Sequence, residues 1–291
     1  MRNTKGILLA GGRGTRLAPM TSVLNKHLIP IYDKPMIYYP LSTLMLCGIR
    51  EIALVTNPED VPLFKKLLGD GSQIGISITY FVQQNPNGLP EALTITRDYL
   101  RGSKSVLILG DNLLIGQGLG TTLESHLNHE GASILAFPVN NPQDYGVVEF
   151  DDSGKVISIE EKPPYPKSHF AVPGIYFFDE NVSKYSSELK PSVRGELEIV
   201  DLLRKYLDLN LLRITTLKRG TGWMDAGTTE SLFAASELVR VLQQRQGYRF
   251  NVPEEIAYNQ GWISKIDLKA AAQKFINTSY GLYLEELTKD F

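Results

Sequence analysis

Cysteine is almost absent from this chain of 291 residues, which contains only Cys47. One thiol cannot form an internal disulfide framework or a cysteine-based metal site. Long apolar runs are also missing: none approaches the ~20 residues of a membrane span, and the first one, Ile7–Ala10, is too short for a signal-peptide core. We therefore expect a cytoplasmic protein with no membrane partner.

An excess of charge of one sign is missing as well, since 30 Lys and Arg residues face 32 Asp and Glu residues, for a net charge of −2. Dedicated nucleic-acid or membrane-surface binders usually carry a basic face that raises this balance. We expect no nucleic-acid partner, so any bound nucleotide is free. A hydrophobic content of 43% over this length allows one large domain, alone or with a small appendage.

Histidine is scarce, with four residues. His126 and His129 are spaced to share a helical face, but no acidic or cysteine partner accompanies them. We expect both at the surface, without a metal.

The first half of the chain alternates strand-like apolar runs with helix-like stretches. The expected strands are Gly6–Ala10, Glu51–Thr56, Ile76–Val82, Ser105–Leu109 and Ala132–Pro138. The expected helices are Leu41–Cys47, Pro58–Leu68, Leu89–Leu100 and Leu119–His129. This alternation predicts an α/β fold with a Rossmann-like, mainly parallel central sheet flanked by helices, whose ligands bind beyond the carboxyl ends of the strands.

After about residue 140 the pattern changes. The runs Val147–Phe150 and Val156–Glu160 flank Asp151-Asp152-Ser153-Gly154, which predicts a hairpin, and Ala171–Phe178 predicts another strand. From residue 229 the chain becomes helical and charged, over Glu230–Gln246 and Leu268–Leu287. We expect a catalytic domain over 1–228, with a nucleotide-binding part to about residue 140 and antiparallel sugar-binding additions over 141–228, and a C-terminal helical element over 229–291 for packing or oligomerisation.

A glycine-rich segment follows the first expected strand: Gly11-Gly12-Arg13-Gly14-Thr15-Arg16-Leu17. Glycines let the backbone approach a ligand closely, and free N–H groups beside Arg16 and Lys26 would surround phosphate oxygens. A P-loop would need Gly-Lys-Ser/Thr, and a dinucleotide fingerprint would need glycine where Leu17 stands. The spacing Gly-x-Gly-Thr-Arg-Leu-x-Pro-x-Thr, then four residues and Lys26, fits neither.

That spacing resembles the sugar-1-phosphate nucleotidylyltransferases, and further motifs follow in the order typical of that family. They are Lys26-His27-Leu28-Ile29-Pro30, Asp33-Lys34-Pro35, Gly110-Asp111-Asn112, Tyr145-Gly146-Val147-Val148, Glu160-Glu161-Lys162-Pro163, Arg194-Gly195-Glu196-Leu197-Glu198 and Trp223-Met224-Asp225-Ala226-Gly227-Thr228. Together they are most similar to the glucose-1-phosphate thymidylyltransferases, over nearly the whole chain.

The resemblance implies an enzyme that transfers a thymidylyl group from dTTP to α-D-glucose 1-phosphate with Mg²⁺, giving dTDP-glucose and pyrophosphate for nucleotide-sugar biosynthesis. It also implies ordered binding, a homotetramer and a second nucleotide site that senses a dTDP-sugar feedback inhibitor. The alternatives are the same chemistry with UTP or another hexose 1-phosphate, and a catalytically silent sugar-nucleotide sensor. A sensor would not need the full set of cations and acids described next.

The reaction must bring two anions together, so cations and a metal site are the parts to seek. The predicted catalytic cations are Arg16, whose planar fork suits the leaving pyrophosphate, Lys26 near the α-phosphate, and, by resemblance, Lys162 at the sugar phosphate. Asp111 and Asp225 each stand at the mouth of an apolar segment and would be ligands of Mg²⁺, although each alone could be a helix cap or turn residue.

The resemblance also divides the predicted binding residues between the two substrates, and some of them are the catalytic and metal-binding residues already named. For the nucleotide they are Gly11, Gly12, Gly14, Thr15, Arg16, Gln83, Gly88 and Asp111, with Gln83 and the Gly88 backbone expected to bind the base. For the sugar phosphate they are Asn112, Tyr145, Gly146, Glu161, Lys162 and Val172. We treat Arg13 as a surface residue.

This chain departs from close relatives at two points. It has Gly88-Leu89-Pro90-Glu91-Ala92 where relatives usually have Gly-Leu-Ala-Gln-Ala, and Pro173 where a threonine is usual. Glu91 brings a carboxylate near the nucleotide, and Pro173 alters the sugar pocket. The choice between dTTP and UTP stays open, because the methyl group of thymine adds roughly 1 kcal/mol of apolar contact.

Overall fold

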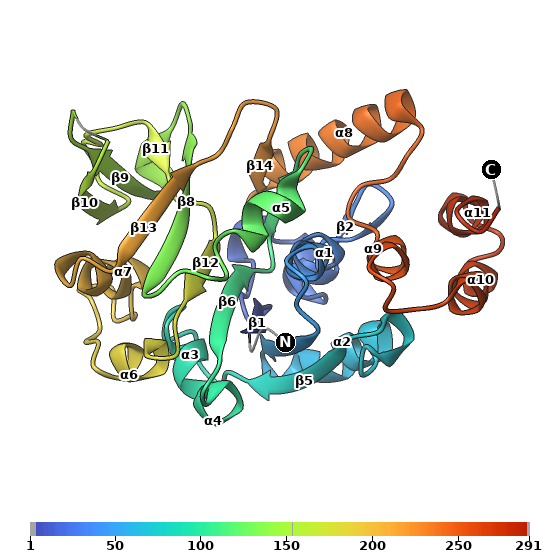
Figure 1. Cartoon of the computed structure of the whole chain (residues 1–291), viewed down its shortest axis with the longest axis horizontal. Helices are drawn as coiled ribbons and strands as arrows, with labels where there is room; N and C mark the ends of the chain where they lie inside the picture. The colour runs from blue at the N-terminus through green and yellow to red at the C-terminus, as the bar shows by residue number, and fades with distance from the viewer. Residues whose placement is uncertain (1–3, 153, 290–291) are drawn as a thin grey trace.

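A mixed sheet of ten strands forms the centre of the computed structural model, which describes residues 4–152 and 154–289 (Figure 1). Its order is β10-β9-β11-β8-β12-β6-β1-β4-β5, and β13 pairs with β8. The strands of the first half are β1 (Thr4–Leu9), β4 (Glu51–Thr56), β5 (Ser77–Val82), β6 (Lys104–Leu109) and β8 (Ala132–Pro138). Of these, β6, β1, β4 and β5 pair in parallel, which confirms the expected parallel centre.

Buried residues on both faces of the parallel strands explain their nearly continuous apolar sequences. Along β1, Leu8 packs into the core on one face, and Ile7 and Leu9 pack into the core on the other. Successive side chains of a strand point to opposite faces, so each face needs its own cover of helices.

The helices of the first half provide this cover. They are α1 (Tyr38–Leu46), α2 (Val61–Leu68), α3 (Glu91–Ile95), α4 (Arg97–Leu100) and α5 (Leu119–Glu124). Buried side chains of α1, α2 and α5 join the cluster of Leu8, whereas those of α3 and α4 join the cluster of Ile7. The sequence predicted one helix over Leu89–Leu100, but the structure divides it at Thr96, and α5 ends earlier than the expected His129.

The second half adds antiparallel strands at one end of the sheet. They are β9 (Gly146–Phe150), β10 (Val156–Glu161), β11 (Phe170–Ala171) and β12 (Ile175–Phe178), and β9 pairs with β10 as the expected hairpin. The single strand expected over Ala171–Phe178 is wrong. It is divided because β11 pairs with β8 and β9, whereas β12 pairs with β8 and β6, and the register against β8 shifts between them.

Further elements complete the fold around this sheet. They are β2 (Pro30–Ile31), β3 (Lys34–Pro35), β7 (Asn112–Ile115), β13 (Leu212–Thr216), β14 (Gly222–Asp225), α6 (Val182–Ser187) and α7 (Ile199–Asp208). The antiparallel pair β7 and β14 packs with α8 (Thr229–Gln246) and with Leu17 of the glycine-rich segment in a third buried cluster. This cluster fixes the glycine-rich segment against the C-terminal part of the chain.

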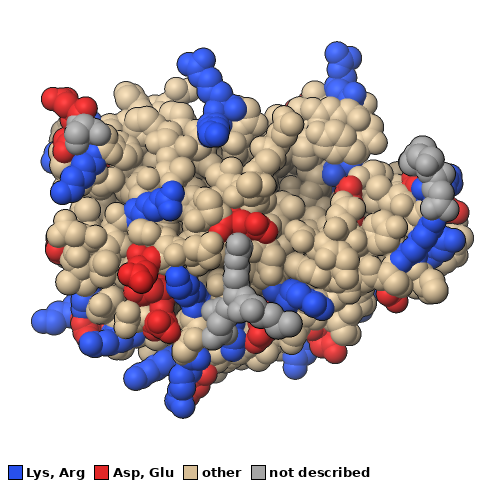
Figure 2. Space-filling view, in the orientation of Figure 1, with Lys and Arg blue, Asp and Glu red and all other residues tan. Residues whose placement is uncertain are grey.

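The C-terminal helices are α8 (Thr229–Gln246), α9 (Pro253–Asn259), α10 (Lys265–Lys274) and α11 (Ser279–Glu286), at the right of Figure 1. The sequence predicted α8 and one helix over Leu268–Leu287. That region is instead two helices, because Thr278 caps a new helix after α10 ends, and α9 was not expected. Within the described residues, no helix combines the length and apolar character that crossing a bilayer requires. Lys and Arg side chains are interspersed with Asp and Glu on the face in Figure 2.

His126 corrects a further expectation. Its side chain is 2% exposed, stacks on Phe177 at 5.0 Å between ring centroids, and contacts the hydroxyl of Ser133 through Nδ1 at 2.6 Å. His129 is half-buried. The expected surface position was therefore wrong for His126, because the turn after α5 packs against β8 and β12.

Candidate active site

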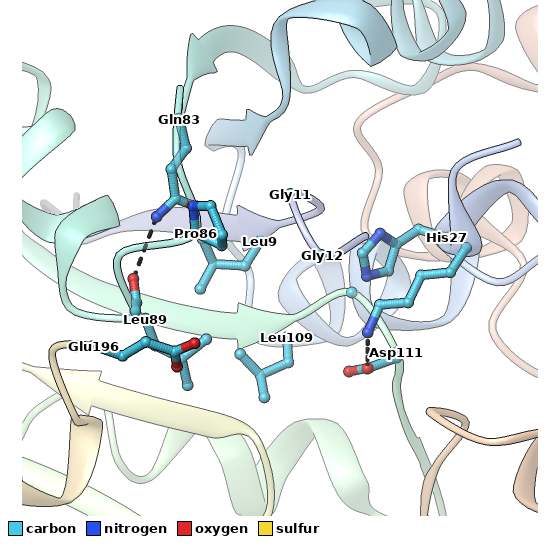
Figure 3. A pocket seen from close by; sticks show the side chains of 13 residues that line it. Leu9, Gly11, Gly12, His27, Gln83, Pro86, Leu89, Leu109, Asp111 and Glu196 are labelled. Carbon is cyan, nitrogen blue, oxygen red and sulfur yellow. Dashed lines mark hydrogen bonds and ion pairs between the residues drawn. The ribbon is translucent and has the colours of Figure 1, made fainter. Parts of the chain in front are cut away.

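Two hollows share a wall at the carboxyl ends of the central strands. The first, of about 670 Å³, is lined by Gly11, Gly12, Lys26, Gln83, Gly88 and Asp111, with Leu9, Leu109 and Glu196 (Figure 3). The second, of about 890 Å³, is lined by Arg16, Asp111, Asn112, Tyr145, Gly146, Glu161, Lys162, Val172 and Asp225. Asp111 lines both, so the structure brings most of the predicted site residues around one carboxylate.

Lys26 reaches Asp111 because the segment before it is held firmly. The ammonium of Lys26 contacts Oδ2 of Asp111, and both side chains are largely buried. The pair is drawn in Figure 3. Asn25 accepts a hydrogen bond from the backbone N–H of His27 at 2.9 Å and donates to the carbonyl of Ala10 at 3.0 Å. These contacts attach the Lys26 turn to the end of β1.

Asp225 lies beside Asp111 because β14 pairs with β7. The N–H of Ala226 donates to the carbonyl of Asp111 at 2.9 Å, and Oδ1 of Asp225 is buried without a hydrogen-bond partner. Burial and then the negative charge of Asp111 raise the pKa of Asp225 to about 6. Burial also acts to raise the pKa of Asp111, but Lys26, His27 and two side-chain hydrogen bonds hold it well below its usual range.

This carboxylate pair fits a divalent cation that prefers oxygen. Among the described residues, no group of three or more His, Cys, Asp and Glu side chains is placed to hold a metal. Mg²⁺, however, often binds through one or two carboxylates together with substrate phosphates and water. The unpartnered oxygen of Asp225 and the repulsion between the two acids are the features that such an ion would relieve.

The guanidinium of Arg16 faces Asp225 across Gly227. A Cβ at Gly227 would lie 2.8 Å from Nη2 of Arg16 and 2.9 Å from Oδ1 of Asp225, so a side chain there would displace both groups. Arg16 is otherwise exposed and available to a ligand.

Gly14, Thr15 and Arg13 lie outside the lining of the two hollows. Gly14 has φ +62°, and a Cβ there would contact the stem of Lys26 at 2.8 Å, so its role in the structure is to let Lys26 pack closely. Thr15 and Arg13 are exposed.

Gln83 and Gly88 lie together at the far end of the first hollow. Gln83 follows β5, is 9% exposed, and donates from Nε2 to the Gly88 carbonyl at 3.3 Å. Gly88 has φ +108° and forms a parallel bridge with Leu197. The bridge joins the loop after β5 to the segment before α7.

The second hollow lies between the hairpin and the central sheet. Lys162 follows β10, and its N–H donates to the Tyr145 carbonyl at 2.9 Å, while the N–H of Val172 donates to the Gly146 carbonyl at 2.8 Å. Asn112 accepts hydrogen bonds from the Gly174 N–H at 2.9 Å and from the indole of Trp223 at 2.7 Å. Burial raises the pKa of Glu161 despite the opposing effect of Lys162.

Arg194 and Trp223 also line this hollow, although neither residue was predicted to have a role there. Arg194 lies 3.7 Å from Glu161 and 2.7 Å from Glu198, measured from Nη2 to the carboxylate oxygens. Trp223 packs edge-to-face on Tyr145, with ring centroids 5.0 Å apart. Both residues belong to the motifs on which the family resemblance is based, so those motifs could have identified them as site residues.

Comparison with known proteins agrees with this architecture. The family model for nucleotidyl transferases matches residues 5–241. A glucose-1-phosphate thymidylyltransferase from Xanthomonas campestris pv. campestris is 50% identical over 290 residues, covering 99% of this chain and 98% of that protein. Another from Mycobacterium tuberculosis is 48% identical over 283 residues, covering 97% and 98%.

Solved structures show the same fold. A Bacillus anthracis protein described as a glucose-1-phosphate thymidylyltransferase superposes with a TM-score of 0.76 at 42% identity, over 81% of this chain and 95% of that one. A UDP-glucose pyrophosphorylase shares the fold, with a TM-score of 0.72 at 24% identity, over 83% of this chain and 100% of that one. The motifs, the fold and the full-length similarity lead to one assignment: the chain belongs to the nucleotidyl transferase family and, within it, to the glucose-1-phosphate thymidylyltransferases.

Proposed function

We propose that the protein transfers a thymidylyl group from dTTP to α-D-glucose 1-phosphate, forming dTDP-glucose and pyrophosphate with Mg²⁺. The observation that carries the proposal is the position of Asp111, on the wall between the two hollows and in contact with Lys26. A reaction between two phosphates needs charge neutralisation where the substrates meet. The names of the relatives that match nearly the full length supply the identity of the substrates.

In this proposal the nucleotide occupies the first hollow, with its base toward Gln83 and Gly88. The backbone at Gly11 and Gly12 approaches its phosphates, and Arg16 binds the leaving pyrophosphate through its planar fork. Lys26 is beside the α-phosphorus and offsets negative charge there as the new bond forms.

The sugar phosphate occupies the second hollow. Lys162 binds its phosphate, Glu161 accepts hydrogen bonds from sugar hydroxyls, and Asn112, Tyr145, Gly146 and Val172 shape the surroundings. An oxygen of the sugar phosphate forms a bond to the α-phosphorus while the bond to the pyrophosphate oxygen breaks. The attacking oxygen is already ionised, so no side chain has to remove a proton.

Asp111 and Asp225 would hold Mg²⁺, which when bound would neutralise phosphate charge and align the triphosphate. Metal binding by Asp225 should depend on pH more strongly than metal binding by Asp111, because the pKa of Asp225 lies close to neutral pH. Lys26 keeps Asp111 ionised at pH values near neutrality.

The proposal also includes the cellular location of the protein and its state of assembly. We place the protein in the cytoplasm, as a homotetramer that a dTDP-sugar inhibits at a second site. Support for assembly comes from exposed apolar side chains on the C-terminal helices, Phe233 and Val241 on α8 and Leu282 on α11. Light scattering in solution tests the tetramer, and inhibition by a dTDP-sugar that is non-competitive with dTTP tests the second site.

The decisive experiment measures pyrophosphate release for each nucleoside triphosphate against a panel of sugar 1-phosphates, with Mg²⁺ and with EDTA. We expect the highest kcat/KM with dTTP and glucose 1-phosphate, and no turnover in EDTA. Turnover with no pair would overturn the enzymatic proposal in favour of a sugar-nucleotide sensor. Faster turnover with UTP would overturn the choice of dTTP.

A further inference from the structure

Glu91 binds two side-chain amides at the far end of the first hollow. Its Oε2 accepts a hydrogen bond from Nε2 of Gln83 at 2.6 Å, and its Oε1 accepts one from Nδ2 of Asn87 at 2.7 Å. Nε2 of Gln83 also donates to the Gly88 carbonyl, the contact drawn at the left of Figure 3. Both N–H groups of Gln83 are therefore directed to acceptors of the protein.

The oxygen of the same amide lies beside Gly11 of the glycine-rich segment. A Cβ placed on Gly11 would lie 3.2 Å from Oε1 of Gln83, and Gly11 and Gln83 both line the first hollow. Gln83 is 9% exposed, so surrounding atoms limit its rotation. Oε1 is thus the side-chain atom that Gln83 offers to a ligand.

The partners of Gln83 decide which way the amide points. A carboxylate and a peptide carbonyl can only accept hydrogen bonds. If the Gln83 amide were reversed, its oxygen would face the acceptors of Glu91 and Gly88, and two hydrogen bonds would be replaced by repulsion. A glutamine at position 91 could donate or accept, so it would allow either orientation.

We infer that Glu91 is a positioning residue that holds Gln83 with its oxygen toward the nucleotide base, so that the site selects bases that present a ring N–H. Thymine and uracil have an imide N–H at the position where cytosine has a bare acceptor nitrogen. This inference deepens the proposed function and rests on it, because it assumes that the base lies at this end of the hollow. The inference gives a role to Glu91, the carboxylate at which this chain differs from its relatives.

The test compares kcat/KM for dTTP and for dCTP, at saturating glucose 1-phosphate, in the wild type and in Glu91→Gln. We expect the ratio of dTTP to dCTP to fall by roughly tenfold or more in the variant, because the orientation that matches cytosine becomes accessible. The change should occur in KM for the nucleotides, with kcat for dTTP nearly unchanged. The matched control is Glu130→Gln, an exposed glutamate after α5 that should leave the ratio unchanged.

Each outcome decides the inference. An equal loss of kcat/KM for both nucleotides would mean that Glu91 only supports the loop, and an unchanged ratio would mean that it does not orient Gln83; either result overturns the inference. If Glu91→Gln does not fold, Glu91→Met keeps the length of the side chain without its acceptors, and the same fall in the ratio is expected. If the wild type turns over no nucleotide, the proposed function fails, and calorimetric affinities for dTTP and dCTP in the same variants then decide the role of Glu91.

Discussion

Asp225 lies beside Asp111, and its carboxyl group resists ionisation because it is buried and because Asp111 is negatively charged. The two acids stand where β14 meets β7, with the Ala226 N–H on the Asp111 carbonyl, and after burial the charge of Asp111 is the main cause that raises the pKa of Asp225 to about 6. Lys26 has the opposite effect on Asp111. Lys26 therefore helps to keep Asp111 an anion, whereas burial and the charge of Asp111 make Asp225 an acid that titrates near neutral pH.

Asp225→Asn should therefore stabilise the metal-free protein while abolishing turnover. A folded-state pKa above the ordinary 3.8 means that ionised Asp225 disfavours the folded state, a cost absent below about pH 4 and complete above about pH 6. In EDTA at pH 8 we expect a gain in the free energy of unfolding on the order of 1–3 kcal/mol, and no gain near pH 4. Urea unfolding at both pH values measures it. A variant less stable than the wild type at pH 8 would contradict the prediction.

Asp111→Asn should abolish turnover and also destabilise the fold. The pKa of Asp111 is held below its usual range, so the stability that it contributes is present above the ordinary pKa and lost as the pH falls. Removing the carboxylate takes away the ion-pair partner of Lys26, at a cost of about 3 kcal/mol, and relief of the repulsion on Asp225 returns only a part of this cost. Urea unfolding at pH 7 should show this loss, and the double variant Lys26→Met, Asp111→Asn should regain much of it. Failure of the double variant to regain stability would show that the pair is not the cause.

Lys162→Met should weaken the binding of the sugar phosphate alone. Loss of a charge-assisted contact predicts a rise in KM for glucose 1-phosphate of roughly tenfold to a hundredfold, with KM for dTTP nearly unchanged. Steady-state kinetics with each substrate varied in turn measure the two constants. Lys155→Met changes an exposed lysine of the same hairpin and serves as the control. An equal rise in both KM values would argue against a role specific to the sugar phosphate.

His126→Gln should reduce the acid sensitivity of the fold. Burial, and then the charges of Arg213 and His129, lower the pKa of His126 to about 4. Neutral His126 therefore supports the folded state above its ordinary pKa of 6.5, and this support is lost as the pH falls toward 4. Free energies of unfolding at pH 7.5 and 5 should differ less in the variant than in the wild type. An identical pH dependence in both proteins would show that His126 does not contribute.

Gly88→Ala should disrupt the junction between the two hollows. An added Cβ would lie 2.1 Å from the Leu197 carbonyl, and φ is +108°. We expect a loss of more than about 2 kcal/mol of stability together with most of the activity. Gly102→Ala is the matched control, since Gly102 also has positive φ but its added Cβ would meet nothing within 4 Å. Thermal unfolding and turnover of both variants test the prediction, and equal losses would mean that backbone strain alone is responsible.

Local sequence patterns were sufficient for the elements of the parallel sheet. Apolar runs bounded by turns located β1, β4, β5, β6 and β8 to within a residue or two, because strands buried on both faces have nearly continuous apolar sequences. The patterns failed where pairing changes along a strand, as between β11 and β12, and where a cap starts a new helix, as at Thr278. The spacing of apolar residues along a strand does not show which other strands lie beside it.

The sequence by itself determined the parallel core, the glycine-rich segment after β1, and the motifs that identify the family. These depend on apolar spacing and on glycines, which act over a few neighbouring residues. Only the tertiary structure decided that Asp225 lies beside Asp111, that Glu91 orients Gln83, and that His126 is buried. Asp225 meets Asp111 through strand order, and His126 is buried by packing, so both results depend on residues far apart in the chain. The amide of Gln83 takes its orientation from partners that only the folded chain brings within hydrogen-bond distance.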